Sequence, residues 1–127
     1  MKTIELIVPC YNEEKCIELF YNAVREVFAK LPDFDFIITY VDDGSRDNTL
    51  NEMKRTAAAA VEGTVQYIAL SRNFGKESAI YAGLSKSTGD YVALMDADLQ
   101  HPPKLLVQMI DAIEKEGYDR ATARRVS

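Results

Sequence analysis

Residues 91–100 have the sequence Tyr91-Val92-Ala93-Leu94-Met95-Asp96-Ala97-Asp98-Leu99-Gln100, an apolar run followed by two acids and an amide. Such a run, opened by Gly89-Asp90 and closed by acids, is typical of a buried strand. The acids then emerge at the carboxyl end of the strand, where open α/β sheets bind ligands. Two carboxylates with an amide nearby suit Mg²⁺ or Mn²⁺, which prefer oxygen ligands. A surface turn with an aspartate helix cap is the alternative interpretation.

Strand-like and helix-like segments alternate along the rest of the chain. The expected strands are Ile4–Val8, Phe34–Val41, Val65–Leu70 and Tyr91–Met95. The first expected helix has Asn12 as its N-cap and stops at Pro32, and the second runs from the caps Asp47-Asn48-Thr49 to Gly63. A third covers Lys76–Ser87, a fourth begins at Pro102-Pro103 and ends at Gly117, and a fifth strand is expected within Tyr118–Val126.

Apolar residues at helical spacing predict which helix faces point into the core. The expected inner faces are Ile17, Phe20, Val24, Val27, Phe28 and Leu31 in the first helix, Leu50, Met53, Ala57 and Val61 in the second, Ile80, Gly83 and Leu84 in the third, and Leu106, Met109, Ile110 and Ile113 in the fourth. The alternation predicts an α/β, Rossmann-like fold with a mostly parallel sheet and right-handed crossovers. The loops after all four strands are then expected at one edge of the sheet.

Composition limits the possible classes of protein. The 127 residues, 47% of them hydrophobic, suit one domain over residues 1–127. A net charge of -5 argues against nucleic-acid binding. Cys10 and Cys16 show neither zinc spacing nor a disulfide framework, which favours a reducing compartment. No apolar run approaches the roughly 20 residues of a membrane span, and no signal peptide precedes the first strand, so a soluble fragment is expected.

The loops after the first two strands each have a structural and a functional interpretation. Val8-Pro9-Cys10-Tyr11-Asn12-Glu13 is either a plain strand-to-helix turn or a nucleoside contact, with Tyr11 stacking on the base and Glu13 and the first-turn amides facing it. Of Asp42 and Asp43, one is expected in an Asx-type turn and the other at a ribose or base. The chain has no Gly-x-Gly-x-x-Gly in its first turn and no Gly-Lys-Ser/Thr, so nicotinamide and P-loop chemistries are unsupported.

The loop after the third strand carries positive charge. Arg72, Asn73 and Lys76 lie at an expected helix N-terminus, where they could hold a diphosphate. In the alternative interpretation, Arg72 pairs with a carboxylate of the expected metal loop, the segment with Asp96 and Asp98 after the fourth strand. His101, the single histidine, is unsuited to a zinc site and is assigned to loop structure or to the surroundings of the metal.

Four segments together resemble the inverting glycosyltransferases of family two, which have the GT-A fold. They are Val8-Pro9-Cys10-Tyr11-Asn12-Glu13, Val41-Asp42-Asp43-Gly44-Ser45-Arg46-Asp47-Asn48-Thr49, Ser71-Arg72-Asn73-Phe74-Gly75-Lys76-Glu77 and Asp96-Ala97-Asp98-Leu99-Gln100-His101-Pro102-Pro103. The resemblance covers almost the whole chain. It is greatest to bacterial enzymes that transfer a sugar from a nucleotide to a polyprenyl phosphate, relatives of dolichyl-phosphate mannosyltransferase.

The resemblance implies a role for each motif. The nucleotide pocket would be lined by Pro9, Tyr11, Glu13, Val41 and Asp43, supported by Asp42, with Ala97 contacting the donor. Asp96, Asp98 and Gln100 would hold Mg²⁺ or Mn²⁺ on the diphosphate, which makes Asp96 and Asp98 the expected catalytic pair. An acceptor phosphate is already anionic, so this subgroup needs no strong general base.

The resemblance also implies partners and a location. The donor is expected to be a nucleotide-diphosphate sugar, uridine-linked glucose before guanosine-linked mannose, and the acceptor a polyprenyl phosphate or another glycan. The family continues beyond Ser127 through an acceptor-binding half, of which Arg124 and Arg125 would be the first basic residues. We therefore expect the truncated, N-terminal donor-binding part of an enzyme at the cytoplasmic face of the membrane, inactive by itself and able to form a homo-oligomer. A non-catalytic nucleotide-sugar-binding module is the alternative, and a nucleotidyltransferase is disfavoured because the first loop is not Gly-rich.

Overall fold

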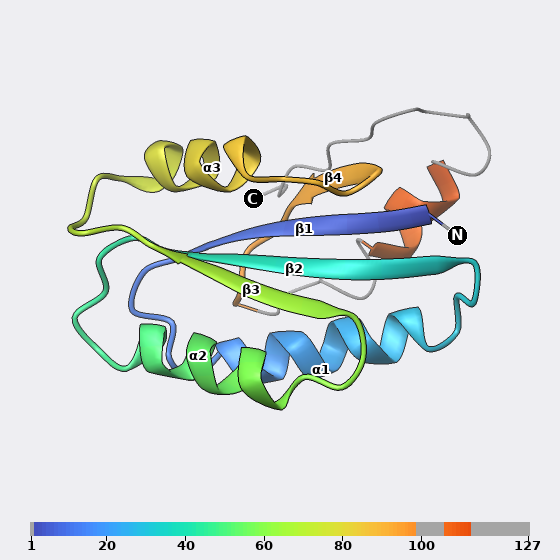
Figure 1. Ribbon diagram of the computed structural model, residues 1–127, viewed down its shortest axis with the longest axis horizontal. Coiled ribbons are helices and arrows are strands. Elements are labelled where there is room, and N and C mark those ends of the chain that lie inside the picture. Colours follow the sequence, from blue (N-terminus) through green and yellow to red (C-terminus); the bar gives the residue numbers. More distant parts are fainter. Residues whose placement is uncertain (1, 99–105, 113–127) are drawn as a thin grey trace.

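The computed structural model describes residues 2–98 and 106–112 and shows a parallel sheet between two layers of helices (Figure 1). The strands are β1 Lys2–Cys10, β2 Phe34–Asp42, β3 Thr64–Ala69 and β4 Tyr91–Leu94. Their order in the sheet is β3-β2-β1-β4, and each neighbouring pair is parallel. The α/β fold with alternating strands and helices expected from the sequence is confirmed.

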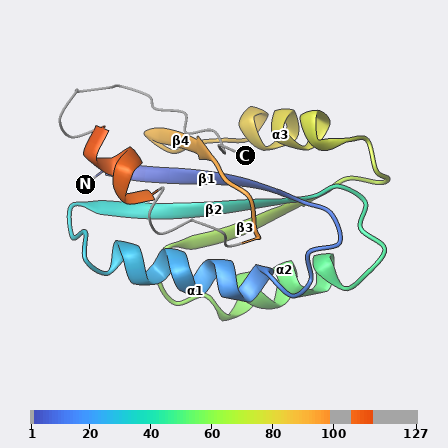
Figure 2. The ribbon, with the colours of Figure 1, turned by 180° about the vertical axis from the view of Figure 1, so that it is seen from behind.

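The helices divide between the two faces of the sheet according to the direction of each crossover. Helices α1 Ile17–Phe28 and α2 Thr49–Ala59 cover one face, and α3 Lys76–Ser85 covers the other (Figures 1 and 2). The chain moves outward from β1 to β3 and then returns past β1 to β4. Because such crossovers are right-handed, reversing the direction places α3 on the opposite face from α1 and α2.

Strand β1 is buried on both faces, as expected for a central parallel strand. Ile4, Leu6 and Val8 pack towards α1 and α2, together with residues 106–112, which are helical and contribute Leu106, Met109 and Ile110 to the same core. Ile7, on the other face, packs with Val41, Ala79 and Val92 beneath α3. Helix α3 lies so close to the sheet that a Cβ added at Gly83 would be 2.4 Å from Ile7 Cγ2.

The limits of the first helix differ from the sequence expectation. Helix α1 begins at Ile17 with Cys16 as its N-cap, and it ends at Phe28 rather than at Pro32. Asn12, the expected cap, has a positive φ of 54°, and its Oδ1 accepts a hydrogen bond from the Arg46 amide at 2.9 Å. Asn12 therefore joins two loops instead of starting a helix, and Glu13 and Glu14 precede the first helical turn.

Two expected core residues are exposed. Helix α2 ends at Ala59, before Gly63, so Val61 falls beyond its inner face and is 80% exposed. Leu84 is 41% exposed because α3 contacts the sheet through the small residues Ala79 and Gly83. The expected end of the fourth helix at Gly117 and the fifth strand within residues 118–126 lie outside the described residues. None of the helices within residues 2–98 and 106–112 has the length and apolar character needed to cross a membrane.

Candidate functional site

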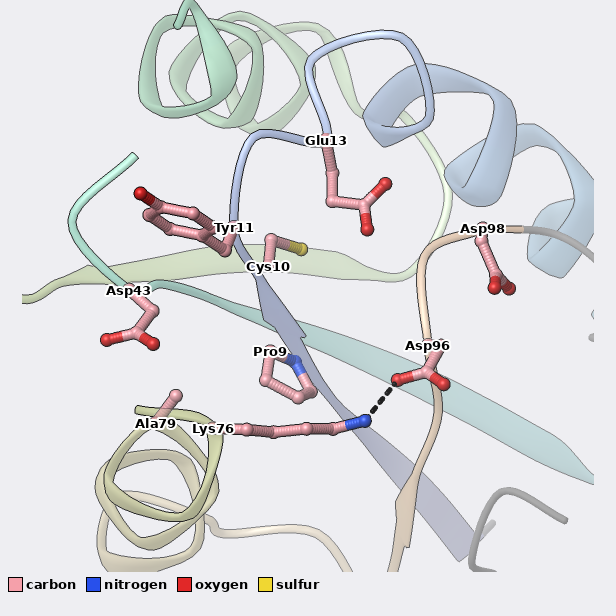
Figure 3. A pocket seen from close by; sticks show the side chains of 9 residues that line it. All are labelled: Pro9, Cys10, Tyr11, Glu13, Asp43, Lys76, Ala79, Asp96 and Asp98. Atoms are coloured by element: carbon pink, nitrogen blue, oxygen red, sulfur yellow. Dashed lines mark hydrogen bonds and ion pairs between the residues drawn. The ribbon is translucent and has the colours of Figure 1, made fainter. Parts of the chain in front are cut away.

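The order of the strands reverses between β1 and β4. Strands β2 and β3 lie on one side of β1 and β4 on the other, so the loops after β1 and β4 leave the sheet in opposite directions. In open α/β sheets a crevice forms at this point, outside the carboxyl ends of the strands. A cavity of about 170 Å³ lies here (Figure 3). Its lining residues are Pro9, Cys10, Tyr11, Glu13, Asp43, Lys76, Ala79, Asp96 and Asp98.

Seven residues singled out from the sequence meet in this cavity: Pro9, Tyr11, Glu13, Asp43, Lys76, Asp96 and Asp98. Val41 and Ala97 are instead buried in the core, and neither lines the cavity. Asp42 is also buried and does not line the cavity, and Arg72 lies outside it. Gln100, the third expected metal ligand, lies outside the described residues, as does His101.

Sequence reasoning missed Cys10 and Ala79. Cys10 is the last residue of β1, between two residues that were singled out, and its position at the strand end was the available signal. Ala79 lies three residues after Lys76 in α3, and residues at this spacing share a helix face. Burial, followed by the nearby carboxylates of Glu13 and Asp42, raises the pKa of the Cys10 thiol well above its ordinary value. The thiol therefore stays protonated at neutral pH.

The loop after β1 is fastened to the loop after β2. The Asn12 amide donates to Ser45 Oγ at 2.9 Å, and the Glu13 amide donates to Thr49 Oγ1 at 2.8 Å. Both amides therefore have partners in the second loop, as in the strand-to-helix turn that was the structural interpretation of this segment. The Tyr11 side chain lines the cavity and is 43% exposed, which leaves its ring open to stacking.

Asp42 and Asp43 are both buried but have different partners. Asp42 Oδ1 accepts a hydrogen bond from the Ser45 amide at 3.1 Å, which closes the turn after β2. The Asp43 carboxylate accepts from the amides of Phe74 and Gly75, at 2.9 and 3.1 Å, and from the Asn73 side chain at 3.2 Å. Asp43 thus lines the cavity and also holds the loop that leads into α3.

Gly44 allows the loops after β2 and β3 to touch. It has a φ of +69°, and a Cβ at this position would be 2.3 Å from the main-chain carbon of Arg72. Only glycine fits both the left-handed backbone and this close approach. The three loops at the carboxyl edge, those after β1, β2 and β3, are therefore joined into one support for the cavity.

Lys76 provides the positive charge of the cavity. Its Nζ lies 3.1 Å from Asp96 Oδ1, and Figure 3 shows the side chain extending from the start of α3 to this carboxylate. The sequence left open a pairing of Arg72 with the metal loop, but it is Lys76 that pairs with Asp96. The Arg72 guanidinium lies over the Phe74 ring, 5.7 Å from its centroid.

The charge balance of the cavity favours a cation. Four acids line it, Glu13, Asp43, Asp96 and Asp98, against the single lysine. Within residues 2–98 and 106–112, no three His, Cys, Asp or Glu side chains form a group that could hold a metal ion. Mg²⁺ commonly binds through one or two carboxylates, with waters and substrate phosphates completing its shell. Asp96 and Asp98 fit that kind of site.

Comparison with known proteins places nearly the whole sequence in one family. Residues 5–127 match the family described as Glycosyl transferase family 2. CsbB of Bacillus subtilis is 43% identical over 96% of this chain, which covers 36% of CsbB. The bactoprenol glucosyl transferase of Shigella phage SfX is 40% identical, again over 96% of this chain and 39% of the relative. The chain thus spans a little over a third of these relatives' length.

Solved structures share the fold. A mannosyltransferase from Pyrobaculum calidifontis, PcManGT, solved in complex with GDP-Man and Mn²⁺, matches with a TM-score of 0.71 and 25% identity, over 87% of this chain and 32% of that one. S. aureus TarS 1-349 in complex with UDP matches with a TM-score of 0.70 and 24% identity, over 92% and 33%. At 24% identity, the likeness to TarS concerns the fold alone.

Proposed function

The chain belongs to glycosyl transferase family 2, and from this premise we propose that it forms the donor-binding part of a metal-dependent, inverting glycosyltransferase. The observation that carries the proposal is the cavity at the switch point of the sheet. It brings together Tyr11 and Asp43 from the segments after β1 and β2, Lys76 from the start of α3, and Asp96 and Asp98 from the segment after β4. Its ligand would be a nucleotide-diphosphate sugar. The match to a GT-A structure solved with GDP-Man and Mn²⁺ supports this assignment.

We assign the parts of the donor by chemistry. The exposed Tyr11 ring suits a base, and Glu13 beside it has carboxylate oxygens that accept hydrogen bonds from a nucleoside. Lys76, at the start of α3, suits the diphosphate as a point charge. Asp43 keeps the preceding loop in place, so it contributes to binding through the position of α3 as well as through its own carboxylate.

Asp96 and Asp98, with Gln100 as the further ligand expected from the sequence, would hold Mg²⁺ or Mn²⁺. A cation held there stabilises the negative charge that develops on the diphosphate as the glycosidic bond breaks. Lys76 faces the same region and adds a second positive group. An acceptor phosphate carries its own negative charge, so its attack on the anomeric carbon needs no strong base from these residues.

The acceptor we propose is a polyprenyl phosphate, because matched relatives are named bactoprenol glucosyl transferase. The full-length enzyme would then act at the cytoplasmic face of a membrane, with a uridine-linked glucose as the first donor to test and guanosine-linked mannose as the second. A family member with a saccharide hydroxyl acceptor, or a non-catalytic nucleotide-sugar module, is the competing proposal. Detection of sugar transfer to polyprenyl phosphate by the full-length protein separates these alternatives.

The volume of the cavity bears on what this chain does alone. Ligand pockets usually measure about 300–1,000 Å³, whereas this cavity measures about 170 Å³. It encloses only part of a nucleotide sugar, so we expect donor binding without efficient transfer from residues 1–127 alone.

The experiment is a calorimetric titration of the chain with UDP-glucose and with GDP-mannose, each with and without Mn²⁺. We expect binding of at least one nucleotide sugar that strengthens when Mn²⁺ is added. A chain that is folded by circular dichroism and binds neither ligand under either condition would contradict the proposal.

A further inference from the structure

We propose that the groove between α1 and α2 is a second ligand site, which takes a small phosphate-bearing anion. The two helices lie side by side over one face of the sheet (Figures 1 and 2). Between them is a cavity of about 180 Å³, and the described residues that line it all belong to these helices. None of them lines the cavity at the switch point of the sheet, so the inference does not depend on the proposed function.

One face of each helix contributes to the groove. In α1, Glu18, Asn22 and Arg25 are three or four residues apart and therefore share a face. In α2, Thr56 and Ala59 share a face in the same way. The side chain of Ala59 is a single methyl group, which leaves room between the helices. The groove is thus an open space with polar side chains along both walls.

Existing contacts hold the two helices together. Arg55 Nη2 lies 2.8 Å from Glu18 Oε2, an ion pair that joins α2 to α1, and Arg55 also pairs with Glu52. The Tyr21 hydroxyl donates to the Glu62 carbonyl at 3.0 Å, which holds this ring in the wall of the groove. Because the walls are already joined, less ordering remains to oppose the binding of a ligand.

The groove has a positive charge that no described carboxylate neutralises. Of the three charged residues that line it, Glu18 and Arg55 pair with each other, which leaves Arg25. Within residues 2–98 and 106–112, no ion pair includes Arg25, whose guanidinium carbon lies 6.0 Å from the centroid of the Tyr21 ring. In a chain with a net charge of -5, such an arginine is available to an anion from outside.

Thr56 adds a buried hydroxyl to the same groove. The residue is 5% exposed, and its Oγ1 has no hydrogen-bond partner in the part of the chain that the structure describes. A threonine within a helix can donate to the carbonyl four residues before it, but Thr56 does not. A buried hydroxyl without a partner destabilises the folded state. The groove is the space in which a ligand can supply that partner.

A phosphate group matches these donors. The Arg25 guanidinium has a fork of N–H groups that fits two phosphate oxygens. The Asn22 side-chain amide, which has no partner among the described residues, and the Thr56 hydroxyl supply further N–H and O–H donors. Asn22 and Arg25 are half-buried, so their side chains can shift to admit an anion to the hydroxyl. About 180 Å³ is several times the share of about 30 Å³ of one water, which leaves room for a small group attached to the phosphate.

The test is a titration with sodium phosphate and, separately, with glycerol 3-phosphate, followed through amide resonances, with sodium chloride at equal ionic strength as reference. We expect saturable shifts at residues 21–25 and 55–59. Tighter binding of glycerol 3-phosphate would assign the site to phosphate esters, and tighter binding of inorganic phosphate to the free ion. Arg25→Ala should weaken binding about tenfold or more, because it removes charge-assisted hydrogen bonds. Lys54→Ala, on the exposed side of α2, is the matched control and should bind like the parent.

The second readout is the melting temperature. Phosphate should raise it more in the parent than in Arg25→Ala, because specific binding to the folded state adds to the general effect of the salt. Thr56→Val keeps the shape of the side chain without the hydroxyl. It should melt at or above the parent in buffer without phosphate, and it should gain less when phosphate is added.

Four results would overturn the inference. They are shifts that chloride reproduces, a folded Arg25→Ala protein that binds phosphate like the parent, an equal gain from phosphate in Thr56→Val and the parent, and shifts confined to Tyr11 and Lys76. The last of these would place phosphate in the cavity at the switch point and leave the proposed function standing. Failure of the chain to bind a nucleotide sugar, with phosphate binding at α1 and α2 retained, would contradict the proposed function alone.

Discussion

Asp42 and Asp43 are adjacent, yet the fold gives them different partners. Asp42 closes its own turn through the Ser45 amide, whereas Asp43 faces the cavity and holds the loop before α3. The sequence indicated that one acid would serve the turn and one the ligand. It could not indicate that the acid at the cavity would also carry three hydrogen bonds from residues 73–75, because those donors come from a distant loop.

We expect Asp43→Ala to weaken UDP binding about tenfold or more, since hydrogen bonds to a charged group are worth about 1.5–3 kcal/mol each. The substitution should also lower the melting temperature, because it leaves the amides of Phe74 and Gly75 without their acceptor. Calorimetric titration with UDP, paired with a thermal melt, checks both effects. Unchanged UDP affinity in a folded Asp43→Ala protein would show that Asp43 serves the fold alone.

Asp96 and Asp98 should be required for metal-dependent binding. Replacement of either by alanine should abolish the strengthening of UDP binding by Mn²⁺, because a bound cation is worth several kcal/mol of charge stabilisation. The melting temperature should stay close to that of the parent. Asp111→Ala, at an exposed position of the helix over residues 106–112, is the matched control for loss of one negative charge. Mn²⁺ dependence that persists in both Asp96→Ala and Asp98→Ala would refute their assignment.

At the scale of elements, the strands followed the sequence pattern more closely than the helix ends did. Apolar runs specify buried strands wherever they lie, so β1 to β4 appear within a few residues of their expected limits. The predicted start of α1 was wrong. Asn12 is a good helix cap in isolation, but its side chain accepts a hydrogen bond from the Arg46 amide in another loop. Such long-range competition for a capping side chain has no local signal.

Helix α3 should be sensitive to added volume at Gly83. A Cβ there would be 2.4 Å from Ile7 Cγ2 and 3.3 Å from Val41 Cγ2, so Gly83→Ala forces α3 away from the sheet. Overpacking of this kind costs about 1–3 kcal/mol. Urea unfolding measures the loss, and Ser78→Ala on the exposed side of α3 is the control expected to stay within about 0.5 kcal/mol of the parent. Equal stability of Gly83→Ala and Ser78→Ala would contradict this packing.

The segment that leads into α2 should make stability depend on pH. Burial by itself would raise the pKa of Asp47, but hydrogen bonds from the Thr49 side chain and amide and from the Glu14 amide outweigh it and lower the pKa. A lowered folded pKa stabilises the protein above the unfolded value of about 3.9, and this contribution is lost as the pH falls through the folded value.

Asp47→Asn should therefore lower the melting temperature near neutral pH, and its difference from the parent should shrink at acidic pH. Asp33→Asn, in the exposed turn before β2, controls for the removal of one carboxylate. A difference between Asp47→Asn and the parent that stays constant from neutral to strongly acidic pH would show that the ionised carboxylate is not what stabilises this segment.

At the scale of the whole molecule, the alternation of elements was enough to predict a parallel sheet and to place its loops at one edge. The strand order β3-β2-β1-β4 was not specified by any single segment, and it is this order that puts the loops after β1 and β4 beside each other. The acids at the end of β4 were recognisable from their pattern. That Lys76 rather than Arg72 reaches Asp96 depends on where α3 begins, which the sequence did not determine.

The central claim is that the cavity between the ends of β1 and β4 binds the donor and its metal, and paramagnetic broadening of amide resonances by Mn²⁺ in the presence of UDP tests it most directly. We expect broadening at Cys10, Tyr11, Asp96 and Asp98 and in the first turn of α3, and none at the opposite edge of the sheet, where Thr3 lies. Broadening centred on that opposite edge, or equal broadening with and without UDP across the whole chain, would contradict the account.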